Sequence, residues 1–330
     1  MIHSFKFDGK DGIVPYAGLT LDPAGNLYGT TEQGGAYQWG TVFKLAPNGD
    51  GGWTESVIHS FNNDGKDGAE PYSALILDAA GNLYGTTYEG GAYDYGAVFK
   101  LTENGDGSWA ESVIHSFNFD GKDGMVPYAS LTLDSAGNLY GTTSDGGVHN
   151  CGTVFKLTPN GDRGWKESVL HSFSREGGDG VGPYAGVVFD SEGNLYGTTT
   201  GGGSRQESCN SGCGTVFRLT PNADGSWTER VLHSFDTTDG GFPFSAVTLD
   251  AAGNLYGTTQ LGGTYKFGTV YKLRRGANGR WKETVLHSFR NHPGNAPDAS
   301  VIFGEHGSLY GTTLGDGGTT THGSVFRITP

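Results

Sequence analysis

Short hydrophobic runs alternate with clusters of polar and turn-forming residues along the whole chain. The runs are rich in Val, Leu, Ile, Thr, Tyr and Phe, and Gly, Asn, Asp and Pro separate them. Runs of this length and composition between turn residues are typical of antiparallel strands. No segment has the periodicity of an amphipathic helix. We therefore predict an all-β protein.

The same order of runs recurs six times. The triplet His-Ser-Phe begins at His3, His59, His115, His171, His233 and His287, with spacings of 56, 56, 56, 62 and 54 residues. Each triplet is followed by strand-like runs, which in the first repeat are residues 15–22, 25–31, 40–45 and 53–61. A four-stranded antiparallel unit that repeats in this way is typical of a β-propeller blade. We predict a six-bladed β-propeller, with residues 1–330 forming a single domain.

The two ends of the chain share one predicted strand. The sixth repeat stops after residues 325–330 and lacks its fourth run, while residues 1–5 match the end of such a run. We therefore predict that the N-terminal strand, near residues 2–6, pairs with residues 324–329 and closes the last blade.

Three motifs recur with few changes. Gly-Asn-Leu-Tyr-Gly-Thr-Thr occupies residues 25–31, 81–87, 137–143, 193–199 and 253–259, and residues 307–313 hold a variant with Ser in place of Asn. Together with Gly-Thr-Val-Phe-Lys-Leu and Val-Ile-His-Ser-Phe, this pattern resembles the bacterial GloVer tandem repeat, which occurs in secreted proteins with surface-anchoring tails. The resemblance covers essentially the whole chain. It implies an extracellular or cell-surface location and no established activity.

Composition and charge exclude several classes of partner. The chain has 59 glycines among 330 residues and is 35% hydrophobic, which argues against a helical bundle. Its 35 acidic and 21 basic residues give a net charge of −14, so it lacks the basic surface that binds nucleic acid or anionic membranes. No stretch approaches the roughly 18 apolar residues of a membrane-spanning helix. We expect a monomer that binds no nucleic acid and has no membrane span.

The variable loops contain aromatic residues suited to a ligand. In a propeller, the loops between second and third strands and the loops that enter the next blade emerge on one face, and here these loops differ between repeats, so we place the site on that face. Near the expected channel mouth stand Tyr16, Tyr72, Tyr128, Tyr184 and Phe244, with Asp298 in the sixth repeat, and the second-to-third loops add Trp39, Tyr93 and Tyr265. Aromatic rings beside acids suit sugars. We predict a carbohydrate-binding protein with a glycan or polysaccharide as partner; the alternative is that these rings only fill the channel or pack loop on loop.

A second hypothesis is enzymatic. Six of the ten histidines belong to the recurring triplet, and we interpret residues present in every repeat as scaffold. Arg290, His292, Asp298 and His322 share the sixth repeat and could supply an acid, a base and a charge stabiliser to a polysaccharide lyase or glycoside hydrolase. A third hypothesis is a passive adhesion or scaffold module.

The sequence gives little support for a cofactor. Residues 8–12, 64–68 and 120–124 read Asp-Gly-Lys-Asp-Gly, whose carboxylates could bind calcium, although Asx-turns explain them better. No metal-ligand spacing appears, so we predict no metal site. If the protein is exported, Cys209 is expected to form a disulfide with Cys213 or with Cys151.

Overall fold

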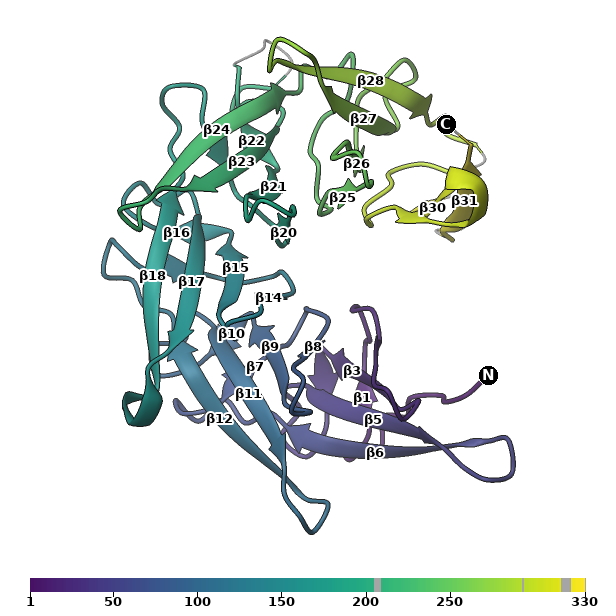
Figure 1. Cartoon of the computed structure of the whole chain (residues 1–330). Coiled ribbons are helices and arrows are strands. Elements are labelled where there is room, and N and C mark those ends of the chain that lie inside the picture. The colour runs from purple at the N-terminus through teal and green to yellow at the C-terminus, as the bar shows by residue number, and fades with distance from the viewer. Residues whose placement is uncertain (205–208, 293, 316–321, 330) are drawn as a thin grey trace. The chain divides into compact units, whose positions relative to one another are not determined.

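The computed structural model describes residues 1–204, 209–292, 294–315 and 322–329, and they group into two compact units. The first unit comprises residues 1–148 and 153–169, and the second comprises residues 149–152 and 170–330. Six antiparallel sheets follow one another along the chain, each built from consecutive strands (Figure 1). The described residues form no α-helix, only the short 3-10 turns η1 (Gly161–Arg163) and η2 (Glu305–Gly307). The prediction of an all-β, six-bladed propeller is confirmed.

Each sheet is one blade, and its strands pair in chain order. The blades consist of β2 (Thr20–Leu21), β3 (Leu27–Thr31), β5 (Thr41–Pro47) and β6 (Trp53–Ser60); β8 (Ile76–Leu77), β9 (Leu83–Thr87), β11 (Ala97–Glu103) and β12 (Trp109–Ser116); β14 (Thr132–Leu133), β15 (Leu139–Thr143), β17 (Thr153–Pro159) and β18 (Trp165–Ser172); β20 (Val188–Phe189), β21 (Leu195–Thr199), β23 (Thr215–Pro221) and β24 (Trp227–Ser234); β25 (Thr248–Leu249), β26 (Leu255–Thr259), β27 (Thr269–Arg275) and β28 (Trp281–Ser288); and β29 (Ile302–Phe303), β30 (Leu309–Thr313) and β31 (Ser324–Ile328).

A short second ladder accompanies each of the first four blades. It pairs the entry to the first strand with the residues that follow the second strand. These ladders are β1 (Gly12–Ile13) with β4 (Gln33–Gly34), β7 (Gly68–Ala69) with β10 (Glu89–Gly90), β13 (Gly124–Met125) with β16 (Asp145–Gly146), and β19 (Gly180–Val181) with β22 (Gly201–Gly202). The ladders hold the variable loops close to the blades that carry them.

The closure of the last blade by the N-terminal strand stays a prediction, because residues 1–7 and β31 belong to different compact units. The sixth sheet has three strands, β29, β30 and β31, and residues 1–7 form no strand. The N-terminal residues pack against the first blade, where the Phe5 and Phe43 rings lie 5.1 Å apart, and the triplet Phe of other repeats packs against its following blade in the same way.

Aromatic packing joins successive blades. The Phe117 ring, from the His-Ser-Phe triplet after β12, meets the Phe155 ring of β17 edge to face at 5.1 Å, and both side chains are fully buried. Gly141 lies opposite Phe155 in the ladder, and a Cβ there would come within 2.5 Å of that ring. The Phe of the triplet and the Gly of the Gly-Thr-Thr motif are therefore packing residues, as the scaffold interpretation of recurring positions predicts.

The tight turn between the first and second strands is a closed hydrogen-bond unit. In the third blade, Asp134 Oδ1 accepts the backbone N–H groups of Ala136 and Asn138, and its Oδ2 accepts Asn138 Nδ2 at 2.7 Å and Tyr140 OH at 3.1 Å. Burial raises the pKa of Asp134, but these hydrogen bonds outweigh burial and lower the pKa overall. The same unit recurs at Asp22, Asp78, Asp190 and Asp250. Every oxygen of the turn carboxylate is occupied, so this end of the blade is structural.

Candidate functional site

The loops between second and third strands expose aromatic rings, as predicted. In the first unit the exposed fraction is 53% for Tyr37, 37% for Trp39 and 58% for Tyr93. The Trp39 carbonyl accepts the backbone N–H of Glu70 at 2.9 Å, which places this loop beside the segment that leads to Tyr72 in the next blade. Tyr265, the corresponding residue in the second unit, is also exposed. Exposed apolar patches can mark surfaces that bind a ligand or a partner.

The tyrosines predicted at the channel mouth contact one another within the first unit. The Tyr72 ring lies 5.5 Å from Tyr16 and 5.4 Å from Tyr128, and Tyr88 lies 4.9 Å from Tyr128. Tyr16 is 68% exposed, while Tyr72 and Tyr128 are half-buried. The half-buried Tyr72 and Tyr128 thus support the side chain of Tyr16, which faces solvent. In the second unit, Tyr184 and Phe244 form a similar pair at 5.4 Å.

Carboxylates stand next to this row of tyrosines. Tyr72 OH donates to Glu32 Oε1 at 2.8 Å. Burial and the neighbouring carboxylates of Glu89 and Glu32 raise the pKa of Glu70, and burial together with Glu32 raises the pKa of Tyr72. Aromatic rings and hydrogen-bond acceptors therefore lie side by side on this surface. We call Tyr16, Tyr37, Trp39 and Tyr93 the aromatic surface of the first unit.

The sixth-blade residues only partly come together. The Arg290 guanidinium stacks 4.4 Å from the Tyr265 ring centroid and donates to Tyr265 OH at 2.6 Å. Arg290, His292 and Tyr265 line a cavity of about 710 Å³. Asp298 and His322 are not among the residues that line it. Asp298 is half-buried, and burial raises its pKa, while His322 is exposed just before β31. The cavity therefore brings together Arg290 and His292 of the enzymatic hypothesis, but neither Asp298 nor His322.

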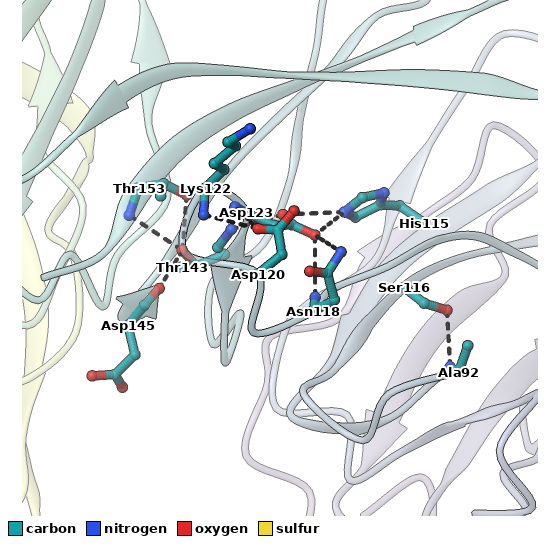
Figure 2. A network of polar contacts seen from close by, with 11 residues as sticks. Ala92, His115, Ser116, Asn118, Asp120, Lys122, Asp123, Thr143, Asp145 and Thr153 are labelled. Atoms are coloured by element: carbon teal, nitrogen blue, oxygen red, sulfur yellow. Dashed lines mark hydrogen bonds and ion pairs between the residues drawn. The ribbon is translucent and has the colours of Figure 1, made fainter. Parts of the chain in front are cut away.

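The Asp-Gly-Lys-Asp-Gly loops divide their two aspartates between different tasks. Asp120 Oδ1 accepts the backbone N–H groups of Lys122 and Asp123, which is an Asx-turn. Asp123 is buried and turns the other way, toward His115 and the backbone N–H of Asn118 (Figure 2). The first aspartate therefore stabilises the turn by accepting backbone N–H groups, and the second faces the triplet histidine.

A recurring His-Asp pair was missed in the sequence because the triplet histidines were set aside as scaffold. His Nε2 lies 2.9 to 3.2 Å from an Asp Oδ2 in five repeats, and none of these side chains is more than 21% exposed. The pairs are His3 with Asp11, His59 with Asp67, His115 with Asp123, His171 with Asp179, and His233 with Asp239. The signal was present in the sequence as a fixed spacing: eight residues separate His and Asp in the first four pairs.

A glutamate from the fourth strand of the following blade joins each pair. Glu55, Glu111, Glu167, Glu229 and Glu283 occupy the same position of that strand, and Oε1 of each is buried without a hydrogen-bond partner among the described residues. Burial, followed by the charge of Asp123, raises the pKa of Glu167 to about 7, although His115 opposes the shift. Burial also raises the pKa of each of the other four glutamates. Three groups, His3–Asp11–Glu55, His115–Asp123–Glu167 and His171–Asp179–Glu229, bring one ligand atom from each residue within 4.8 Å of the others.

The cysteines adopt one of the two predicted pairings. Cys209 and Cys213 form a disulfide, with Cα atoms 5.4 Å apart, and both are buried. Cys151 is a free, buried thiol that donates to the His149 carbonyl. The bridge ties together the end of the insertion that lengthens the fourth repeat.

Sequence comparison adds a family match. The family model described as the Gloeobacter/Verrucomicrobia repeat matches residues 1–209 and 162–330, which together span the chain. No curated protein matches this chain. In the described part of the chain, no helix has the length and apolar character needed to cross a membrane.

Solved structures share the fold at low identity. A luciferin-regenerating enzyme is 17% identical, with 97% of this chain and 92% of that chain covered and a TM-score of 0.52. A Thermus thermophilus protein described as a putative oxidoreductase (glucose dehydrogenase) is 18% identical, with 96% and 97% covered and a TM-score of 0.52. An ancestral GH74 enzyme is 12% identical, with 94% of this chain but 41% of that chain covered and a TM-score of 0.58. At these identities the likeness shows the fold alone.

Proposed function

The chain belongs to the Gloeobacter/Verrucomicrobia repeat family, and we propose that it is an extracellular carbohydrate-binding β-propeller. The ligand is a neutral or weakly polar oligosaccharide or polysaccharide that stacks on the aromatic surface of the first unit. The observation that carries this proposal is the exposure of Tyr16, Tyr37, Trp39 and Tyr93 on variable loops. Contact between apolar ring surface and water is unfavourable, so a partner that covers these rings gains free energy from burying them.

Sugar chemistry matches these side chains better than a purely apolar partner does. The C–H faces of pyranose rings stack on aromatic rings, and their hydroxyls need hydrogen-bond acceptors nearby. Glu32 and Glu70 place carboxylates beside Tyr72, and Tyr72 in turn contacts the exposed Tyr16. The fold likeness to a glycoside hydrolase of the GH74 class is consistent with a carbohydrate-related role. The family resemblance, with its secreted and surface-anchored members, supports the extracellular location.

Glycan-array screening followed by calorimetric titration tests the proposal. We expect one or more oligosaccharides to bind, and Trp39→Ala or Tyr93→Ala to weaken the affinity roughly tenfold, which corresponds to about 1.4 kcal/mol for a lost stacking contact. Leu21→Ala is the matched control, because Leu21 is an exposed apolar side chain beside the Asp22 turn rather than on these loops. The proposal fails if no saccharide binds, or if the control weakens binding as much as the aromatic variants do.

The enzymatic alternative is tested in the same samples. The cavity lined by Arg290, His292 and Tyr265 is the observation that keeps it in view. We would then test whether the protein releases new reducing ends or unsaturated sugars from a panel of polysaccharides. Release that His292→Ala abolishes would favour the enzymatic hypothesis over simple binding. Binding without product release supports the lectin-like role.

A further inference from the structure

We propose that His115, Asp123 and Glu167, and the equivalent residues of other repeats, form binding sites for a divalent transition metal ion of the Zn²⁺ type that joins the outer strands of consecutive blades. The proposal does not depend on the proposed function, although Tyr37 of the aromatic surface lines one cavity with His59, Asp67 and Glu111 of an equivalent group. It also revises the sequence-based expectation that the chain has no metal site.

The donor set favours this class of ion. Each site offers one imidazole nitrogen and two carboxylates, a combination that suits Zn²⁺ and related ions, whereas Ca²⁺ prefers oxygen ligands alone. His115 Nε2 lies 3.2 Å from Asp123 Oδ2. Two ligands of one Zn²⁺ at about 2.1 Å are separated by about 3.4 Å in a tetrahedral site. The His-Asp distance therefore already matches one edge of a coordination polyhedron, and the Glu167 oxygen lies within 4.8 Å of both partners, so a side-chain rotation can complete the face.

Unsatisfied oxygens are the second, independent observation. Glu167 Oε1 is buried and has no hydrogen-bond partner among the described residues, so this oxygen is not satisfied by the part of the protein that the structure describes. The same oxygen is orphaned in all five fourth-strand glutamates. At the first site, Asp11 is only 9% exposed, and its Oδ1 is also without a partner. A buried polar atom that recurs unsatisfied at one position needs a partner that the polypeptide does not supply, and a cation can be that partner.

Local charge and access are compatible with a cation. Asp120 adds a third carboxylate near Glu167, while Figure 2 shows the ammonium end of Lys122 directed away from the His115–Asp123 contact. A cavity of about 310 Å³ is lined by His3, Asp11 and Glu55, together with Lys6, Asp8 and Lys10, so an ion can reach the first site. Lys10 has a counterpart in Lys122, but Asn118 stands at the position of Lys6, so we expect the site of His115 to bind more tightly than the site of His3.

The placement of the ligands gives the ion a structural task. His115 lies on β12 in the second blade, Asp123 lies in the loop that enters the third blade, and Glu167 lies on β18 in the third blade. One ion would therefore cross-link neighbouring blades at their outer strands. His287 serves as an internal comparison: the sequence has Pro293 before Gly294, where the other repeats have Asp before Gly, so no fifth-to-sixth-blade site is expected.

Metal titration of chelator-treated full-length protein tests this inference. With Zn²⁺ we expect at least three ions per chain, corresponding to the three complete groups, and a rise in melting temperature of about 5 °C at saturation. Co²⁺ is the spectroscopic probe, and we expect the visible absorption of a low-symmetry nitrogen and oxygen site. Ca²⁺ should bind more weakly and leave the melting temperature almost unchanged.

Variants assign the binding to these residues. Glu167→Gln and, separately, His115→Asn should each remove one Zn²⁺ per chain, whereas Glu192→Gln, at an exposed turn, should remove none. Circular dichroism confirms that each variant is folded, and Glu55→Gln and Glu229→Gln provide the same test at the other sites if Glu167→Gln is not folded. The inference is overturned if Zn²⁺ does not bind, if Ca²⁺ binds in its place, if the stoichiometry is unchanged in the triad variants, or if His306→Asn removes the binding instead.

Discussion

Two carboxylates that recur in every complete blade lie in opposite environments. Asp134 accepts four hydrogen bonds that lower its pKa despite partial burial, and Tyr140 OH is one of the donors. Glu167 is raised to a pKa of about 7, mainly by burial, and one of its oxygens has no protein partner in the described part of the chain. Recurrence alone would classify both as scaffold. Hydrogen-bond satisfaction separates a residue that completes the fold from one that awaits a partner.

Acid titration should produce the largest effect of this contrast, because the five turn aspartates are protonated over the same pH range. Their folded pKa lies below the ordinary value of 3.8, so their stabilising contribution is complete above that pH and is lost as the pH falls through the lower folded value. We expect the melting temperature to drop as the pH falls below the ordinary aspartate pKa of about 4. Thermal unfolding followed by circular dichroism measures it, and a flat profile over this range would contradict the assignment.

Removal of one turn carboxylate should have the next largest effect. Asp134→Ala leaves the Asn138 amide and the buried Tyr140 hydroxyl without their acceptor, and we expect the free energy of unfolding to fall by about 2 kcal/mol. Urea denaturation measures the change. Asp134→Asn, which keeps one acceptor oxygen, should lose less; equal stability of the alanine variant and the native chain would show that the turn does not need its carboxylate.

Deletion of a single donor sharpens the comparison. Tyr140→Phe removes the hydroxyl that donates to Asp134 Oδ2 and preserves the ring under Lys156, whose ammonium lies 5.3 Å from the ring centroid. We expect a loss of about 1 kcal/mol, measured by the same denaturation. A loss comparable with that of Asp134→Ala would mean that the other donors to the carboxylate contribute little.

The smallest change in the free energy of unfolding is expected for a substitution of Glu167. In the presence of a chelator, Glu167→Gln removes a buried charge that lacks a partner, so the free energy of unfolding should stay within about 0.5 kcal/mol of the native value or rise. With saturating Zn²⁺ the same variant should become less stable than the native chain. A large loss in chelator would show that Glu167 is already satisfied within the protein.

Repetition made most of the fold predictable. The motif that contains Gly141 places a small residue opposite Phe155, and the Asp134 turn needs only residues close in sequence, so both could be inferred from local pattern. The closure of the sixth blade is a prediction of a different kind. It depends on pairing between segments at opposite ends of the chain, and β31 belongs to a three-stranded sheet.

The candidate sites divide in the same way. Exposure of Trp39 and Tyr93 followed from their position in variable loops, whereas the exclusion of Asp298 and His322 from the cavity lined by Arg290 was decided by side-chain positions. The histidines of the triplet were discounted because every repeat has one. The fixed spacing of eight residues could have shown their aspartate partners, whereas the glutamate comes from the next blade and no local motif displays it.

The sequence alone determined the blade count, the strand-turn rhythm and the aromatic character of the loops, because each of these arises from the order of residues within a single repeat. Only the tertiary structure decided that Asp123 faces His115, that Glu167 reaches both, and that its oxygen is left unsatisfied. The physical reason is that burial and hydrogen-bond partnership are properties of neighbours in space, and here those neighbours belong to different blades.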